Sequence, residues 1–99
     1  MLQPKITQDQ IDNWKIAHGD VYHIVVEDKE CYLKAPDRKT LSYASTVGTT
    51  DAMRFNDIIL KECWLAGDEE IKTIDAYFLG VSTQLDKVCE FKKAELVKL

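Results

Sequence analysis

The sequence has few of the residues that build phosphate-binding loops. Its 99 residues include four glycines and two prolines. These glycines do not have the spacing of a P-loop or of a dinucleotide fingerprint, which excludes both nucleotide-binding motifs. The Gly-x-Ser-x-Gly elbow of hydrolases and the zincin motif are also missing from the sequence. We therefore expect no cofactor and no catalytic machinery of these classes.

Cysteines are too few and too widely spaced for a zinc site or a disulfide framework. Cys31, Cys63 and Cys89 form no Cys-x-x-Cys pair and have no zinc spacing with either histidine. Each has an apolar or aromatic residue directly beside it, and in such surroundings a free thiol behaves as a small hydrophobic side chain. This pattern predicts three buried, reduced thiols and no bound metal.

The two histidines offer little for catalysis. His18 precedes Gly19 at a predicted helix end, where the helix dipole favours a cationic side chain. His23 lies in a predicted strand, and Cys31 is the one thiol that a hairpin would bring near it. A thiol nucleophile needs such a neighbouring base. Hairpins also pair residues without any function, so this pair does not by itself indicate catalysis, and we expect no enzyme.

No charge of one sign dominates, and no apolar run exceeds a few residues. The net charge is -4, from 13 Lys and Arg against 17 Asp and Glu spread along the chain. This balance disfavours nucleic-acid binding. The apolar runs are far shorter than the roughly 20 residues that span a bilayer, and no apolar run follows Met1–Lys5. We expect a cytoplasmic protein without a membrane or nucleic-acid partner.

The composition is that of one folded domain. Hydrophobic residues make up 45% of the chain and charged residues 30%, which is ordinary for a globular protein and disfavours disorder. A chain of this length suits one domain with one modest core. We therefore predict a single domain over residues 1–99.

The first third of the chain predicts a helix followed by a hairpin. Thr7 and Gln10 have the spacing of a capping box, which opens a helix through about Ala17. Val21–Val26 and Cys31–Lys34 are rich in β-branched and aromatic residues and flank a polar turn, which predicts an antiparallel hairpin. The alternation places Tyr22, Ile24 and Val26 on one face, and His23 and Val25 on the other.

The remaining chain predicts helices. Asp37 is expected to cap a helix over 38–47, and Asp51 a stronger one over 52–65, with an acidic loop after it. Thr73 is expected to cap the last helical region, which Thr83 divides or kinks. The fold class is therefore α+β, with one N-terminal helix, an antiparallel β-hairpin, and then three to four helices.

The candidate contact residues are apolar side chains outside the predicted core. Ile58 and Leu65 lie seven residues apart on one side of the predicted 52–65 helix, either packed on the fold or exposed to a partner. Packing is the favoured interpretation, because most apolar stripes are core. Leu96 and Leu99 belong to an apolar final segment, which docks on its own domain, on a second copy or on a partner.

The order of landmarks along the chain resembles that of small phage and prophage tail assembly chaperones of gut bacteria. The matching segments are Trp14, Gly19–Ile24, Cys31–Lys34, Pro36–Arg38, Leu41–Ala44, Phe55–Asn56, Ile58–Leu60, Cys63–Leu65, Gly67–Ile71, Phe78 and the Lys- and Glu-rich C-terminal segment. None of these landmarks is catalytic, and the resemblance covers most of the chain.

The resemblance implies a partner and a role. Such chaperones coat the long tape-measure protein of a phage tail, keep it soluble, and leave as the tail tube assembles. The landmarks that carry over are expected mainly in the core; they are Trp14, Tyr22, Tyr32, Pro36, Phe55, Trp64 and Phe78. Trp64 is also a candidate half-exposed anchor, because it lies at a predicted helix end beside the acidic loop.

Three other functions stay open at this point. One is a structural virion component, such as a tail or head-completion protein. Another is a small protein-interaction regulator. The third is a small enzyme that uses Cys31 and His23. Self-association of the chain is left open as well.

Overall fold

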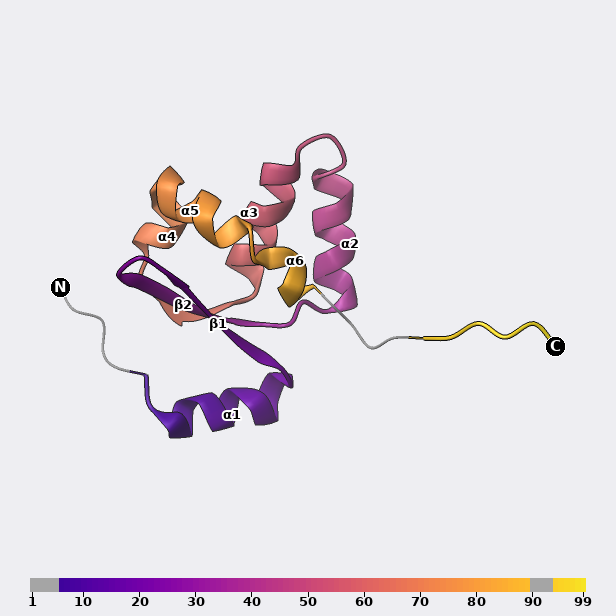
Figure 1. The fold of residues 1–99 in the computed structure, drawn as a ribbon, viewed down its shortest axis with the longest axis horizontal. Helices are drawn as coiled ribbons and strands as arrows, with labels where there is room; N and C mark the ends of the chain where they lie inside the picture. The colour runs from indigo at the N-terminus through magenta and orange to yellow at the C-terminus, as the bar shows by residue number, and fades with distance from the viewer. Residues whose placement is uncertain (1–5, 90–93) are drawn as a thin grey trace.

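A three-stranded antiparallel sheet separates one helix from all the others (Figure 1). The computed structural model describes residues 6–89 and 94–99. In chain order, these residues form α1 (Gln8–His18), β1 (Val21–Val26), β2 (Lys29–Lys34), α2 (Arg38–Val47), α3 (Ala52–Glu62), β3 (Trp64–Gly67), α4 (Glu70–Thr73), α5 (Asp75–Ser82) and α6 (Leu85–Val88). Helix α1 lies against one face of the sheet, and the later helices lie on the opposite side (Figure 1). This arrangement confirms the predicted α+β class.

Three helices begin where the sequence predicts, because their caps are local. Thr7 and Gln10 form a reciprocal capping box. The Gln10 N–H donates to Thr7 Oγ1 at 3.2 Å, and the Thr7 N–H donates to Gln10 Oε1 at 2.9 Å. Asp37 accepts the Thr40 N–H at 2.8 Å at the start of α2. Asp51 likewise accepts two backbone N–H groups at the start of α3.

The hairpin has a two-residue turn and a regular register. Val26 pairs with Lys29, and Glu27 takes a positive φ of 57° in the turn between them. Ile24 pairs with Cys31, which places both side chains on the face that meets α3–α6. His23 pairs with Tyr32 on the face that meets α1. The predicted division of β1 into two faces is confirmed.

The predicted helix over 52–65 is too long. Helix α3 ends at Glu62, and Trp64–Gly67 forms a third strand instead. The Cys63 carbonyl accepts the Lys34 N–H at 2.9 Å, which ties the end of the helix to β2. Gly67 has a φ of +147°, and a Cβ placed there would lie 2.6 Å from Cys31 Cα. Only glycine allows this close approach of β3 to β2.

The predicted cap at Thr73 is also wrong. Thr73 is the last residue of α4, and its hydroxyl donates to the Glu69 carbonyl at 3.4 Å. The next helix follows Ile74, which has no side-chain cap bond. The predicted division near Thr83 is confirmed, because α5 ends at Ser82 and a short α6 begins at Leu85.

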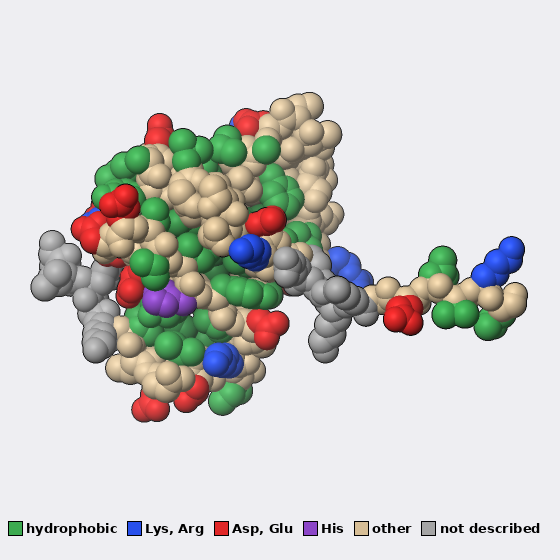
Figure 2. All heavy atoms as spheres, in the orientation of Figure 1, with side chains coloured by type: hydrophobic (Ala, Val, Ile, Leu, Met, Phe, Trp, Pro, Cys, Tyr) green, Lys and Arg blue, Asp and Glu red, His purple; other side chains and the backbone are tan. Residues whose placement is uncertain are grey.

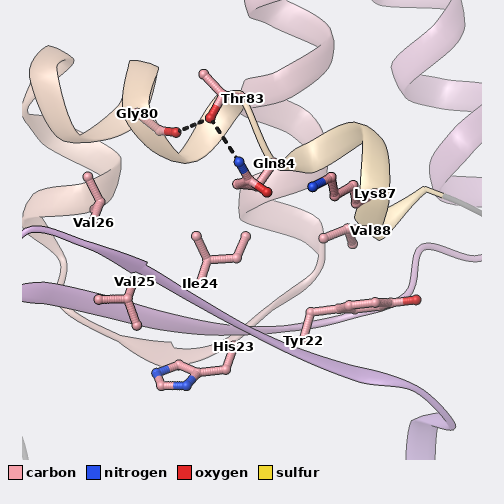
Figure 3. Close-up of a pocket in the computed structure, with 10 residues that line it drawn as sticks. All are labelled: Tyr22, His23, Ile24, Val25, Val26, Gly80, Thr83, Gln84, Lys87 and Val88. Atoms are coloured by element: carbon pink, nitrogen blue, oxygen red, sulfur yellow. Dashed lines mark hydrogen bonds between the residues drawn. The ribbon is translucent and has the colours of Figure 1, made fainter.

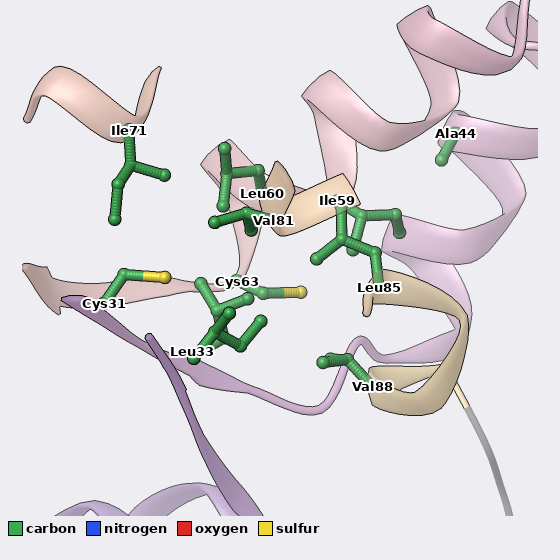
Figure 4. Packing of buried hydrophobic residues seen from close by; sticks show 11 residues of the cluster. Cys31, Leu33, Ala44, Ile59, Leu60, Cys63, Ile71, Val81, Leu85 and Val88 are labelled. Carbon is green, nitrogen blue, oxygen red and sulfur yellow. The ribbon is translucent and has the colours of Figure 1, made fainter. Parts of the chain in front are cut away.

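The core lies between the sheet and helices α2–α6, on the side of the sheet opposite α1 (Figure 4). It consists of Ile24, Cys31, Leu33, Ala44, Ile59, Leu60, Cys63, Ile71, Val81, Leu85 and Val88. All three cysteines are free thiols: Cys31 and Cys63 are buried, and Cys89 is half-buried. Burial raises the pKa of the Cys31 thiol to about 12 and that of Cys63 to about 11, so both stay protonated at neutral pH.

Candidate functional site

The first strand, β1, lies at an edge of the sheet. The hydrogen bonds of its neighbour β2 show which backbone N–H and C=O groups of β1 point toward that edge. The order is β1-β2-β3. The Glu30 carbonyl accepts the Asp68 N–H at 2.9 Å, and the Lys34 N–H donates to Cys63 on the same side. Glu30 and Lys34 therefore direct their backbone groups toward β3. Because these groups alternate along an antiparallel strand, Cys31 and Leu33 bond to β1.

The partners on β1 alternate in the same way. Tyr22 and Ile24 pair with Leu33 and Cys31, and so take part in the ladder. Val21, His23 and Val25 then direct their N–H and C=O groups to the open edge. Within residues 6–89 and 94–99, no backbone hydrogen bond reaches these outward groups. Such an edge is a template for another strand.

A groove of about 450 Å³ runs between β1 and α5–α6, beside this edge. Figure 3 shows Ile24 directed toward the helices and His23 directed away from them. The walls are formed by Tyr22–Val26 of β1 and by Gly80, Thr83, Gln84, Lys87 and Val88. Both Ile24 and Val88 are buried, so the floor of the groove is apolar.

The helical wall of the groove is held close to β1 and has a polar rim. A Cβ at Gly80 would lie 2.9 Å from Val26 Cγ2, so the glycine lets α5 approach the strand. The Thr83 hydroxyl donates to the Gly80 carbonyl at 2.8 Å, and the Gln84 amide donates to Thr83 at 3.4 Å. Lys87 makes no ion pair with any other described residue. Among the residues that the structure describes, it is therefore a cation without an ion-pair partner on the wall.

The other face of β1 carries an aromatic stack. The His23 ring lies parallel to the Tyr32 ring, with centroids 4.4 Å apart, and Trp14 of α1 contacts Tyr32 at 5.7 Å. His23 Nε2 lies 3.2 Å from Glu30 Oε2. Burial, and then the Glu30 charge, raise the pKa of Tyr32. The stack fixes α1 to the sheet and holds the β1 side chains in place.

The hypothesis of a Cys31–His23 pair does not fit this geometry. Cys31 pairs with Ile24 and points into the core, whereas His23 pairs with Tyr32 on the opposite face. Side chains of adjacent positions in a strand point to opposite faces. The thiol and the imidazole therefore cannot meet across this hairpin. His18 does lie in the last turn of α1, as predicted.

The structure does not bring the sequence-predicted contact residues together. Ile58 packs against the core from α3. Trp64 and Leu65 are half-buried on β3, which is the other edge of the sheet, and Lys72 Nζ lies 4.3 Å from the centroid of the Trp64 ring. Leu96 and Leu99 are fully exposed in a segment that extends away from the body (Figure 1).

The β1 edge was not predicted, although part of its signal is in the sequence. The sequence places Val25 with His23 on the face of β1 opposite Ile24, and the structure leaves its side chain 61% exposed. The sequence does not reveal that β3 pairs with β2 and leaves β1 open. Figure 2 shows one side of the whole molecule. Hydrophobic side chains gather on it both over the helices and between the sheet and α1.

Two further properties concern the part of the chain that the structure describes. No group of three His, Cys, Asp or Glu side chains among these residues is placed to hold a metal ion. None of the helices formed by these residues has the length and apolar character needed to cross a membrane.

No protein-family model, curated protein or solved structure matches the chain.

Proposed function

We propose that this chain is a non-enzymatic protein-binding assembly factor that holds an extended segment of its partner along β1. The observation that carries the proposal is the open edge of β1 beside an apolar-floored groove. An extended segment laid there bonds to the outward groups of Val21, His23 and Val25. Its alternate side chains enter the groove above Ile24. This is strand addition, in which the backbone provides affinity and the groove provides selectivity.

The strength of such a contact suits transient binding. Each backbone hydrogen bond contributes a net ~0.5–1.5 kcal/mol. Apolar side chains on the groove floor add about 25 cal/mol for each Å² of apolar surface that they bury. Ordering an extended segment offsets part of this gain. A contact of this size holds an unassembled partner and releases it when the partner finds a larger interface.

The resemblance to phage tail assembly chaperones supports a particular partner. We propose the tape-measure protein of the same phage or prophage, held in the host cytoplasm before the tail tube forms around it. A long protein that awaits assembly exposes apolar segments, and a small acidic domain keeps the complex soluble. The binding edge and the net charge of -4 are both consistent with this role.

Co-expression with the tape-measure protein, followed by size-exclusion chromatography, tests the proposal. We expect the tape-measure protein to become soluble and to co-elute with this chain. Val25→Pro removes one outward N–H and is expected to abolish co-elution, whereas Val25→Thr keeps that N–H and is expected to retain it. An insoluble tape-measure protein, with this chain eluting alone, would contradict the proposal. Recovery of the chain in purified particles would then favour a structural virion component.

A further inference from the structure

We propose that, in the absence of a partner, the β1 edge binds residues 94–99 of a second copy as an added strand. The inference rests on the proposed function only in using the same edge and groove. It adds a specific occupant that is present on the chain itself. The partner segment and residues 94–99 then compete for one site, so self-association limits access to the edge until a partner is available.

The first support is that both halves of such a contact lack a partner within the described structure. Residues 94–99 belong to no helix or strand. Leu96 and Val97 are 99% and 71% exposed, and Leu99 is fully exposed. The outward backbone groups of β1 also have no described partner. Exposed apolar segments and open strand edges are both features that proteins usually cover.

The second support is the alternation of the segment. In an extended strand, Glu95, Val97 and Leu99 share one side, and Leu96 and Lys98 share the other. If the first side faces α5–α6, Val97 and Leu99 lie over the apolar groove floor. Leu96 then lies on the side of exposed Val25. Each apolar side chain of the segment therefore meets an apolar surface.

The third support is charge. Lys87 lies on the wall of the groove without an ion pair to any described residue. Glu95 is the one acidic residue in 94–99, and it falls on the side that faces α5–α6. The two charges meet when the strand enters beside α6. This places Glu95 near the Tyr22 end of β1 and Leu99 near Gly80, so the added strand runs parallel to β1.

A second copy is a better occupant than the same chain. Residues 94–99 extend away from the sheet of their own chain (Figure 1). Reciprocal exchange between two copies forms two identical strand additions about a two-fold axis, which is the commonest symmetry of soluble homo-oligomers. The two additions reinforce each other, because the second forms within an existing complex. A closed dimer therefore forms where a single segment alone would bind weakly.

Sedimentation velocity of the purified full chain over a wide range of concentration tests this inference. We expect a monomer–dimer equilibrium. Lys87→Glu is expected to weaken dimerisation by about tenfold, because the charge pair occurs twice in the dimer. The double variant Lys87→Glu with Glu95→Lys is expected to restore it. Val25→Pro is expected to be monomeric, and Val25→Thr is expected to dimerise like the original chain.

The results separate this inference from the proposed function. A chain that stays monomeric at every concentration, or a double variant that stays as weak as Lys87→Glu alone, would refute the exchange of residues 94–99. The tape-measure experiment is independent, because it measures a heteromeric complex. Dimerisation that follows the predicted pattern without tape-measure binding would refute the proposed function and leave this inference standing.

Discussion

Two proline substitutions at neighbouring positions of β1 test the derived direction of its backbone groups. Ile24→Pro removes an N–H that bonds to β2, and it leaves a carbonyl of β2 without that donor. This costs about 1–3 kcal/mol. Loss of side-chain packing at this buried position adds about 1 kcal/mol. The free energy of unfolding is therefore expected to fall by about 2–4 kcal/mol.

Val25→Pro is expected to be mild by comparison. The N–H that it removes points to the open edge, where the proline ring also has space. The Val25 side chain is mostly exposed, so little packing is lost. The expected cost is about 1 kcal/mol, the average for a point substitution. Edge strands tolerate proline for this reason, and a residue before proline favours the extended backbone that Ile24 already has.

Urea unfolding followed by circular dichroism measures the difference. With a slope of about 1 kcal/mol per molar urea, Ile24→Pro lowers the midpoint by about 2–4 M and Val25→Pro by about 1 M. Ile24→Val is the control for packing, because it keeps the N–H and removes one methyl group. Equal decreases of the urea midpoint in the two proline variants would refute the assignment of the Ile24 N–H to β2 and of the Val25 N–H to the edge. The open edge would be refuted with it.

Two further predictions concern stability. Gly67→Ala is expected to destabilise the fold by clearly more than Gly19→Ala. Both glycines have positive φ, but only a Cβ at position 67 meets backbone, 2.5 Å from the Glu30 carbonyl oxygen. Equal urea midpoints for the two variants would contradict the close approach of β3 to β2. The buried thiols are expected to make the chain less stable at alkaline pH, because the unfolded state ionises near the ordinary pKa of 9.0 whereas the pKa of folded Cys31 is about 12. Their contribution is complete below pH 9 and is lost as the pH rises toward 12. Cys31→Ala is expected to lower stability at pH 8 and to flatten this pH dependence, and an unchanged slope would contradict the assignment.

Much of the fold could be predicted because its signals are local. The caps at Thr7, Asp37 and Asp51 satisfy N–H groups within a few residues, so their sequence spacing is enough to place a helix start. The hairpin is equally local, since its two strands are joined by a two-residue turn. The division of β1 into two faces follows from the period of a strand.

The third strand was missed because its cause lies far along the chain. The apolar stripe of the predicted 52–65 helix reaches Cys63, and Leu65 follows Ile58 by seven residues on another side, so the helical period alone gives no reason to end the helix at Glu62. What ends it is pairing with β2, some thirty residues earlier, together with the close contact of Gly67 and Cys31. The wrong prediction placed Trp64 and Leu65 in a helix, whereas the structure places them in β3.

The candidate site depends on the same distant pairing. The sequence suggested contact surfaces at Ile58, Trp64 and Leu65, and in residues 96–99. The structure adds the β1 edge, which no other described strand covers because β3 joins the other side of β2. The terminal segment can be identified from its apolar character, but the position of Lys87 on the groove wall is known only once α6 is placed beside β1.

Amide hydrogen exchange, resolved by residue in the free chain and in its proposed complex with the tape-measure protein, tests the central claim most directly. The free chain is measured as a dilute Lys87→Glu variant, so that self-association does not interfere. The outward amides of Val21, His23 and Val25 are predicted to exchange rapidly in the free chain and slowly in the complex. A stable complex in which these three amides exchange as fast as in the free chain would show that the partner binds elsewhere, and would contradict the account.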